Sequence, residues 1–249
     1  MNTPGDKFNA LKLTTCAKQY ETVLKEATAK NLSFTETMEW LLDVEIDARK
    51  QRSMQRCFLF SRLREQRTMD EFKFNLHHSR MEQKNKILRL LDLEFLKKGT
   101  NVIIIGNPGT GKTFLSKILG WKACQNNTRV LFISAMDMLN HLIAAQVDHS
   151  LVKHLKTYTS PSLLVCDELG YLTLDQQTSN LFYQVISARY SLKKSTIITT
   201  NTAFTEWGTI LHNTTIAAAI VDRLVEDSEV VLLGGKSIRN PKMKFDAAL

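Results

Sequence analysis

The chain has 249 residues, of which 33 are lysine or arginine and 25 are aspartate or glutamate, so its formal net charge is +8. A hydrophobic fraction of 43% and a charged fraction of 23% are ordinary for a globular protein and exclude a disordered chain. No apolar run approaches the roughly 20 residues that a membrane-spanning helix needs, and no secretory leader is evident, so we expect a cytoplasmic protein without membrane contact.

The cysteines are too far apart in sequence to suggest a metal site. They are Cys16, Cys57, Cys124 and Cys166. No CxxC motif occurs, and the adjacent His77 and His78 have no nearby cysteine, so we predict no zinc centre. In the cytoplasm these thiols are expected to stay reduced.

The first part of the chain is predicted to be helical. Residues 12–67 contain no proline or glycine, and their apolar residues recur at three- and four-residue steps. Ser33 and Glu36 form a capping-box pattern that predicts the start of a second helix, which continues into an arginine-rich stretch. Residues 68–75 are expected to be a linker, and a further helix is expected from about Ser79 to Lys98.

Positive charge is concentrated in residues 49–67. The basic side chains there are Arg49, Lys50, Arg52, Arg56, Arg62, Arg64 and Arg67. The only acid in this stretch is Glu65. Such an excess suits a polyanion such as nucleic acid, because phosphate contacts dominate the affinity for DNA. A solvated helix face is the alternative.

After residue 100 the pattern changes to apolar strands that alternate with helices. The strands are expected at residues 102–105, 129–133, 163–166, 195–200 and 229–233. The helices between and beside them are expected at residues 113–124, 136–145, 150–159, 176–190 and 215–225. Continuous apolar strands separated by helices predict an α/β fold whose parallel sheet has helices on both faces.

The strongest motif has the sequence GNPGTGKT and matches G-x-x-x-x-G-K-[ST]. Its residues are Gly106, Asn107, Pro108, Gly109, Thr110, Gly111, Lys112 and Thr113. It lies between a predicted strand and a predicted helix, as a phosphate-binding loop requires. The glycines let backbone N–H groups surround phosphate oxygens, and the helix N-terminus favours negative charge. Lys112 would reach the β- and γ-phosphates of ATP, and the Thr113 hydroxyl would ligate Mg²⁺.

Two acids, Asp167 and Glu168, follow the apolar residues 163–166. In a parallel sheet such a strand brings side chains to the edge where ligands bind. Asp167 would hold Mg²⁺, and Glu168 would orient and deprotonate the attacking water. A helix cap is the alternative. The second acid favours hydrolysis over phosphoryl transfer to a small substrate.

Asn201 and Arg223 are two further candidates for the catalytic site. Asn201 follows residues 195–200, and if that strand lies between the other two, its amide would reach the γ-phosphate or the attacking water. An ordinary turn residue is the alternative. Arg223 lies near the end of the small-residue segment AAAIVDRL. It is either an arginine offered to a neighbouring subunit's γ-phosphate, which can accelerate hydrolysis about 10³–10⁵-fold, or part of a surface salt bridge.

Several longer strings extend these motifs over nearly the whole chain. They include LSFTETMEWLLDVEIDAR, T-x-x-x-F-x-F, DELGYLTLD, IITTNTAFTEWG, AAAIVDRL and GGKSIR. With them the chain resembles the IstB-like helper ATPases of insertion-sequence transposition, a branch of the AAA+ superfamily close to the DnaC helicase loaders.

The resemblance implies a five-stranded P-loop NTPase sheet in the order 5-1-4-3-2, without a C-terminal lid domain. It implies that Asn201 is the sensor, that Arg223 is an arginine finger and that Arg239 lies near the nucleotide. Two positions depart from the family pattern. Ser-Ile-Arg replaces Ser-Tyr-Arg at Arg239, and Asn201-Thr202 replaces Ser-Asn. The resulting division is a helical DNA-binding or assembly domain over residues 1–70 and an ATPase domain over residues 71–249.

The function that the resemblance implies is ATP-dependent assembly on double-stranded DNA. The protein would form a homo-oligomer with ATP sites at its subunit interfaces, and it would recruit and stimulate a partner transposase. A replicative helicase loader of the DnaC type is the alternative. A small-molecule P-loop kinase is disfavoured by Glu168 and by the absence of a lid segment.

Overall fold

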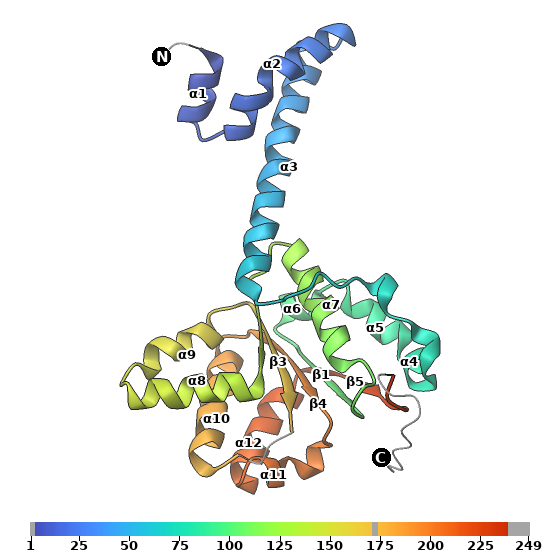
Figure 1. Cartoon of the computed structure of the whole chain (residues 1–249), viewed down its shortest axis with the longest axis vertical. Helices are drawn as coiled ribbons and strands as arrows, with labels where there is room; N and C mark the ends of the chain where they lie inside the picture. The colour runs from blue at the N-terminus through green and yellow to red at the C-terminus, as the bar shows by residue number, and fades with distance from the viewer. Residues whose placement is uncertain (1–2, 171–173, 239–249) are drawn as a thin grey trace. The chain divides into compact units, whose positions relative to one another are not determined.

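The computed structural model describes residues 3–170 and 174–238 (Figure 1). The chain divides into two compact units, residues 1–56 and residues 57–249, which we call the N-terminal unit and the ATPase unit. Helix α3 (Phe34–Ser61) contributes residues to both units. The predicted division near residue 70 concerns function, between a DNA or assembly segment and an ATPase, and it stays a prediction.

The N-terminal unit consists of α1 (Pro4–Ala10), α2 (Thr14–Ala29) and most of α3. The predicted capping box is present, because the Ser33 N–H donates to Glu36 at 2.7 Å and the Glu36 N–H donates to the Ser33 hydroxyl at 3.3 Å. The small core contains Cys16, Val23 and Leu41. Few buried apolar side chains hold this unit together, so its polar contacts matter for its stability.

One such contact is made by Glu45, whose side chain is only 3% exposed. Its carboxylate accepts the N–H groups of Thr15 at 2.7 Å and Cys16 at 3.1 Å, in the first turn of α2. It also accepts hydrogen bonds from Arg49 at 2.9 Å and Arg52 at 3.1 Å. Burial alone raises the pKa of Glu45, but the hydrogen bonds from Arg49 and the two N–H groups outweigh it and hold that pKa at about 2. Glu45 therefore joins α3 to α2 as a buried anion.

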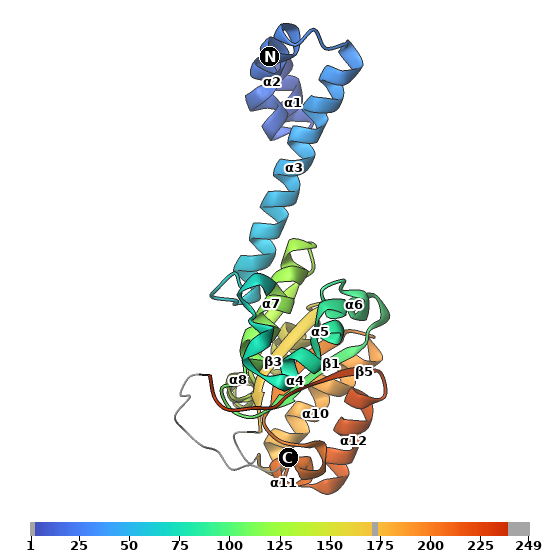
Figure 2. The ribbon, with the colours of Figure 1, turned by 90° about the vertical axis from the view of Figure 1, so that its right-hand side faces the viewer.

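The ATPase unit contains five parallel strands in the order β2-β3-β4-β1-β5, which confirms the predicted sheet. Their bounds are β1 (Asn101–Gly106), β2 (Val130–Ser134), β3 (Leu163–Leu169), β4 (Ser195–Thr200) and β5 (Ser228–Leu233). Alternate residues of β1 face opposite sides: Ile103 and Ile105 belong to the large core formed with α8, α10 and α12. Figure 2 shows helices on both faces of the sheet.

Among the α-helices described after β1, five agree closely with the predicted segments, and the short helix α11 was not predicted. Their bounds are α7 (Lys112–Gln125), α8 (Ala135–Val147), α9 (Leu151–Thr159), α10 (Gln176–Ser191), α11 (Trp207–Ile210) and α12 (Thr214–Val225). Within residues 3–170 and 174–238, no helix is both long and apolar enough to cross a membrane.

The single helix predicted over residues 79–98 is wrong. The structure has three short helices there, α4 (His78–Glu82), α5 (Lys84–Leu90) and α6 (Glu94–Lys98). Leu93 adopts a left-handed conformation, with φ of 57°, which interrupts the helix before α6. The break is compatible with the burial of Ile87, Leu90, Leu93 and Phe95, which are at most 7% exposed. Burial of apolar side chains has overridden the local preference for one helix.

Candidate nucleotide-binding site

The GNPGTGKT loop connects β1 to the first turn of α7. Gly109 and Gly111 have φ angles of 77° and 95°, in the left-handed region that favours glycine. Gly111 is the N-cap of α7, so the loop leads directly into the positive end of that helix. At Gly106 a side chain would collide with the backbone of Leu233 in the neighbouring strand. The glycines thus serve both the turn and the packing of the loop.

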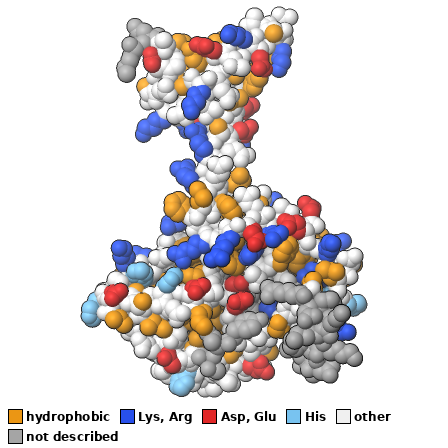
Figure 3. Space-filling model, in the orientation of Figure 1, with side chains coloured by type: hydrophobic (Ala, Val, Ile, Leu, Met, Phe, Trp, Pro, Cys, Tyr) orange, Lys and Arg blue, Asp and Glu red, His pale blue; other side chains and the backbone are white. Residues whose placement is uncertain are grey.

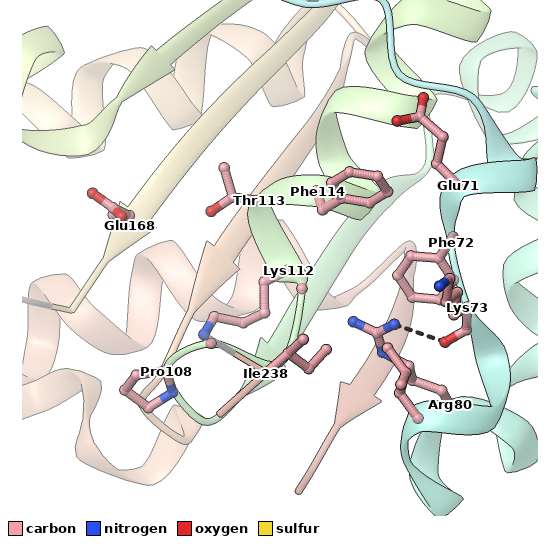
Figure 4. Close-up of a pocket in the computed structure, with 13 residues that line it drawn as sticks. Glu71, Phe72, Lys73, Arg80, Pro108, Lys112, Thr113, Phe114, Glu168 and Ile238 are labelled. Carbon is pink, nitrogen blue, oxygen red and sulfur yellow. Dashed lines mark hydrogen bonds between the residues drawn. The ribbon is translucent and has the colours of Figure 1, made fainter. Parts of the chain in front are cut away.

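A cavity of about 310 Å³ lies beside this loop (Figure 4). It is lined by Glu71, Phe72, Lys73, Leu76, Arg80, Pro108, Gly109, Gly111, Lys112, Thr113, Phe114, Glu168 and Ile238. Lys112 is 7% exposed, and its ammonium donates to the carbonyl oxygens of Gly106 at 2.7 Å and Asn107 at 3.0 Å. The cavity is large enough for a small-molecule ligand and combines phosphate-loop groups with apolar side chains.

One wall of the cavity is the segment that the sequence identified only as a linker. Phe72 is 3% exposed and stacks on Phe114 of α7 with ring centroids 6.3 Å apart. Arg80 donates from Nε at 3.2 Å and from Nη2 at 2.6 Å to the Thr110 carbonyl, and from Nη1 at 2.8 Å to the Lys73 carbonyl. Its guanidinium lies 4.1 Å from the Phe72 ring centroid, and burial lowers its pKa. Arg80 therefore fastens this wall to the phosphate loop.

Asp167 lies at the carboxyl end of β3 and is 5% exposed. Its Oδ1 accepts hydrogen bonds from the hydroxyls of Thr113 at 3.1 Å and Thr199 at 2.5 Å. Burial raises the pKa of Asp167, although these two hydrogen bonds and the charges of Lys117 and Lys112 oppose the shift. A hydroxyl and a carboxylate that converge in this way are the hard oxygen donors that Mg²⁺ prefers.

Thr199 in β4 is a residue that the sequence analysis missed. Its hydroxyl donates to Asp167 and accepts the Glu168 N–H at 2.9 Å, and its side chain is completely buried. Glu168 has a φ of 62°, an uncommon conformation for a residue with a side chain. The strand pairing of β3 and β4 shifts between Cys166 and Leu169 at this point. Thr199 thus connects both acids of the site across the two strands.

The remaining predicted site residues lie in different places. Asn201 directly follows β4, and its side-chain oxygen accepts a hydrogen bond from the Thr202 hydroxyl at 3.2 Å. Arg223 donates to the Ala219 carbonyl at 2.8 Å and lies 5.1 Å from the Tyr183 ring centroid, and it is not among the residues that line the cavity. Arg239 is outside the described residues.

The predicted basic helix ends at Ser61, so the candidate DNA contacts divide into two groups. Arg62, with φ of 60°, begins a non-helical segment that also contains Arg64 and Arg67. Among the seven basic side chains, four contact carboxylates: Arg49 and Arg52 bind Glu45, Lys50 approaches Asp47, and Arg67 binds Glu65 and Glu71. No carboxylate partner in the described chain contacts Arg56, Arg62 or Arg64.

The chain is similar to known proteins over nearly its whole length. The family model "IstB-like ATP binding protein" matches residues 6–246. The insertion sequence IS232 putative ATP-binding protein of Bacillus thuringiensis subsp. berliner is 35% identical over 92% of this chain and 90% of its own length. The insertion sequence IS21 putative ATP-binding protein of Pseudomonas aeruginosa is 31% identical over 93% of this chain and 86% of its own length.

Solved structures share the fold of the ATPase unit. The DnaC helicase loader has a TM-score of 0.56 and 25% identity, and the match covers 63% of this chain and 91% of that one. AMPPCP-bound DnaA from Aquifex aeolicus has a TM-score of 0.57 and 20% identity, over 69% of this chain and 51% of that one. The P-loop AAA+ fold predicted from the sequence is thereby confirmed.

Proposed function

This chain belongs to the family of IstB-like ATP-binding proteins, and we propose that it is an ATPase that assembles on double-stranded DNA and recruits its partner transposase. The observation that carries the proposal is the contact between Thr113 of the phosphate loop and Asp167 at the end of β3, beside Glu168. Relatives from insertion sequences that match over nearly the whole chain support the transposition role.

Within the site, each side chain has a distinct part in hydrolysis. Lys112 would bind the β- and γ-phosphates, and Thr113 and Asp167 would hold Mg²⁺, which when bound neutralises phosphate charge. Glu168 lines the cavity and would orient the attacking water and accept its proton. The hydrogen bond from its N–H to Thr199 would keep it in place before the nucleotide binds.

Two substitutions test the ATPase proposal. Lys112→Ala should abolish ATP binding, whereas Glu168→Gln should bind ATP but hydrolyse it at least about 100-fold more slowly, because it lacks the base. Hydrolysis is measured as phosphate release, and binding with a fluorescent ATP analogue. Equal hydrolysis by Glu168→Gln and the wild type would remove Glu168 from the catalytic role.

Arg223 would complete the ATP site of a neighbouring subunit. Arg223 is not among the residues that line the cavity of its own chain, which supports a role in trans. Arg223→Ala should bind ATP and lose most hydrolysis, since an arginine finger contributes about 10³–10⁵-fold. Mixing Arg223→Ala with Lys112→Ala protein should restore part of the activity, because one protein supplies the binding loop and the other the arginine.

Arg56, Arg62 and Arg64 are the best candidates for phosphate contacts, because no carboxylate in the described chain holds them. If each contacts one phosphate of duplex DNA, the logarithm of the affinity should fall with the logarithm of salt concentration with a slope of about −2.7 per subunit. Replacing one of them by alanine should reduce that slope by about 0.9. The absence of duplex DNA binding with ATP and Mg²⁺ at low salt would contradict the DNA-binding proposal.

A DnaC-type helicase loader is the second candidate, favoured by the structural likeness to the DnaC helicase loader. Affinity purification with the purified chain as bait distinguishes the two. Recovery of a transposase supports transposition, and recovery of a replicative helicase, together with preference for single-stranded DNA, supports loading.

A further inference from the structure

A groove on the ATPase unit lies at the opposite end of the sheet from the phosphate loop. Its cavity of about 520 Å³ is formed by the end of α3, the beginning of β2 and α9. Two apolar side chains beside it are strongly exposed, Leu59 at 76% and Phe60 at 73%. Its four charged lining residues are Arg62, Arg129, Lys153 and Lys156. We call this surface the basic groove.

The basic groove has no acid in its lining to balance these charges. None of its four cations forms a salt bridge within the described part of the chain. Nearby, burial lowers the pKa of Lys194, and the charges of Arg189 and Arg129 lower it further. Figure 3 shows lysine and arginine side chains gathered over the part of the ATPase unit where α3 ends. The basic groove therefore suits a negatively charged partner with apolar groups.

The N-terminal unit carries a surface of the opposite kind. On α3, the exposed apolar residues Met38, Leu42 and Ile46 are 36%, 45% and 46% exposed. Each is followed directly by an exposed acid, at Glu39, Asp43 and Asp47. We call these six residues the acidic face of α3. Asp47 approaches Lys50 at 3.5 Å, and that pair is exposed and contributes little. An acidic face of this kind repels DNA, although the chain as a whole is positively charged.

We propose that the basic groove, through Arg129, Lys153 and Lys156, binds the acidic face of α3 from a second copy of this chain. The two surfaces have opposite charge, and each exposes apolar side chains whose burial stabilises association. A second copy can supply the occupant because every copy of the chain carries both surfaces.

This contact is heterologous, because it joins different surfaces on the two copies. Repeating it adds further copies in a ring or an open helical array. The contact uses neither the nucleotide cavity nor Arg223, so association through it should occur without ATP and DNA. If the protein does not self-associate without ATP and DNA, this proposal fails, but the proposed ATPase function is unaffected.

Charge reversal tests the contact in the full-length protein. The groove variant is Lys153→Glu with Lys156→Glu, and the face variant is Asp43→Lys with Asp47→Lys. Sedimentation velocity, without nucleotide or DNA and at low salt, should show self-association of the wild type. Each variant should associate at least about tenfold more weakly than the wild type, because like charges then meet. A one-to-one mixture, or one chain carrying all four changes, should recover association.

A matched control reverses two exposed lysines of α2, Lys18→Glu with Lys25→Glu, which lie outside both surfaces. It should associate as the wild type does, and ATP binding and the melting temperature should show that every variant is folded. A monomeric wild type, unchanged association of either variant, or no recovery in the mixture would overturn the proposal. So would a groove variant that associates normally but loses DNA binding, which would make the groove a DNA site.

Discussion

Replacing Thr199 by valine probes the connection between the two acids of the nucleotide site. Valine has nearly the same shape as threonine but no hydroxyl. The substitution removes the hydrogen bond to Asp167 at 2.5 Å and leaves the Glu168 N–H without its acceptor at 2.9 Å. Both changes occur at a completely buried position, where water cannot replace the lost partner.

The expected size of the effect follows from these two contacts. A hydrogen bond to a charged group contributes about 1.5–3 kcal/mol, and an unpaired buried N–H costs about 1–3 kcal/mol. Asp167 keeps its hydrogen bond from Thr113 at 3.1 Å, which limits the total to about 2–4 kcal/mol. If about 1.4–2.8 kcal/mol of this affects the positioning of Glu168, kcat falls about 10- to 100-fold. The KM for ATP should change little, because Lys112 and the phosphate loop are intact.

Steady-state phosphate release, ATP binding and thermal melting separate positioning from general stability. Thr199→Ser keeps the hydroxyl and should recover most of kcat. Thr196→Val is the matched control at the other end of β4, where the Thr196 hydroxyl accepts from Arg189 at 2.9 Å. It should lower the melting temperature without lowering kcat. The positioning role would be refuted if folded Thr199→Val protein kept the wild-type kcat. It would also be refuted if Thr199→Ser lost as much kcat as Thr199→Val.

Three other substitutions test contacts of the phosphate loop, of the ATPase core and of the N-terminal unit. Arg80→Lys cannot make both hydrogen bonds to the Thr110 carbonyl, so we expect the KM for ATP to rise about tenfold with kcat nearly unchanged in steady-state assays. Arg189→Met leaves several buried carbonyl oxygens without a donor, so chemical denaturation should show a loss of about 3–5 kcal/mol. Glu45→Gln should destabilise the N-terminal unit by about 2–3 kcal/mol at pH 7. This is less than the lowering of the Glu45 pKa to about 2 implies, because its arginine partners are half exposed and solvent screens their charges. Because the folded pKa of Glu45 is depressed, its stabilisation is present above about pH 4.5 and is lost as the pH falls toward 2, and circular dichroism should show this acid sensitivity in the wild type but not in Glu45→Gln.

The sequence was sufficient for the sheet and the phosphate loop because both depend on local patterns. Apolar strands of a parallel sheet are continuous, and the spacing of Gly106, Gly111 and Lys112 is fixed by the turn that must surround a phosphate. The order of the strands came from the family resemblance, and the structure confirms it.

Residues that act through distant contacts were not evident from the sequence. Thr199 lies inside the string IITTNT, where nothing distinguishes it from Thr200 until β3 is placed beside β4. Arg80 belongs to no motif, and its contact with Thr110 crosses 30 positions of sequence. A partial signal was available in the T-x-x-x-F-x-F string, because two phenylalanines in a linker predict burial against another element. The break at Leu93 likewise depends on which apolar side chains the fold must bury.

Charge shows most clearly how tertiary structure changes the interpretation of a sequence. A dense run of arginines predicts one basic surface, but Glu45 and Glu71 neutralise part of it, and the helix ends before Arg62. Positive charge instead collects at the basic groove, from segments that the sequence separates widely. Because an unpaired cation releases more counterions on DNA than one already held by a carboxylate, the local density of arginine is a poor measure of DNA affinity. For DNA affinity the better measure is the number of cations that have no carboxylate partner and are not used in contacts between copies, and the salt slope of DNA binding measures that number.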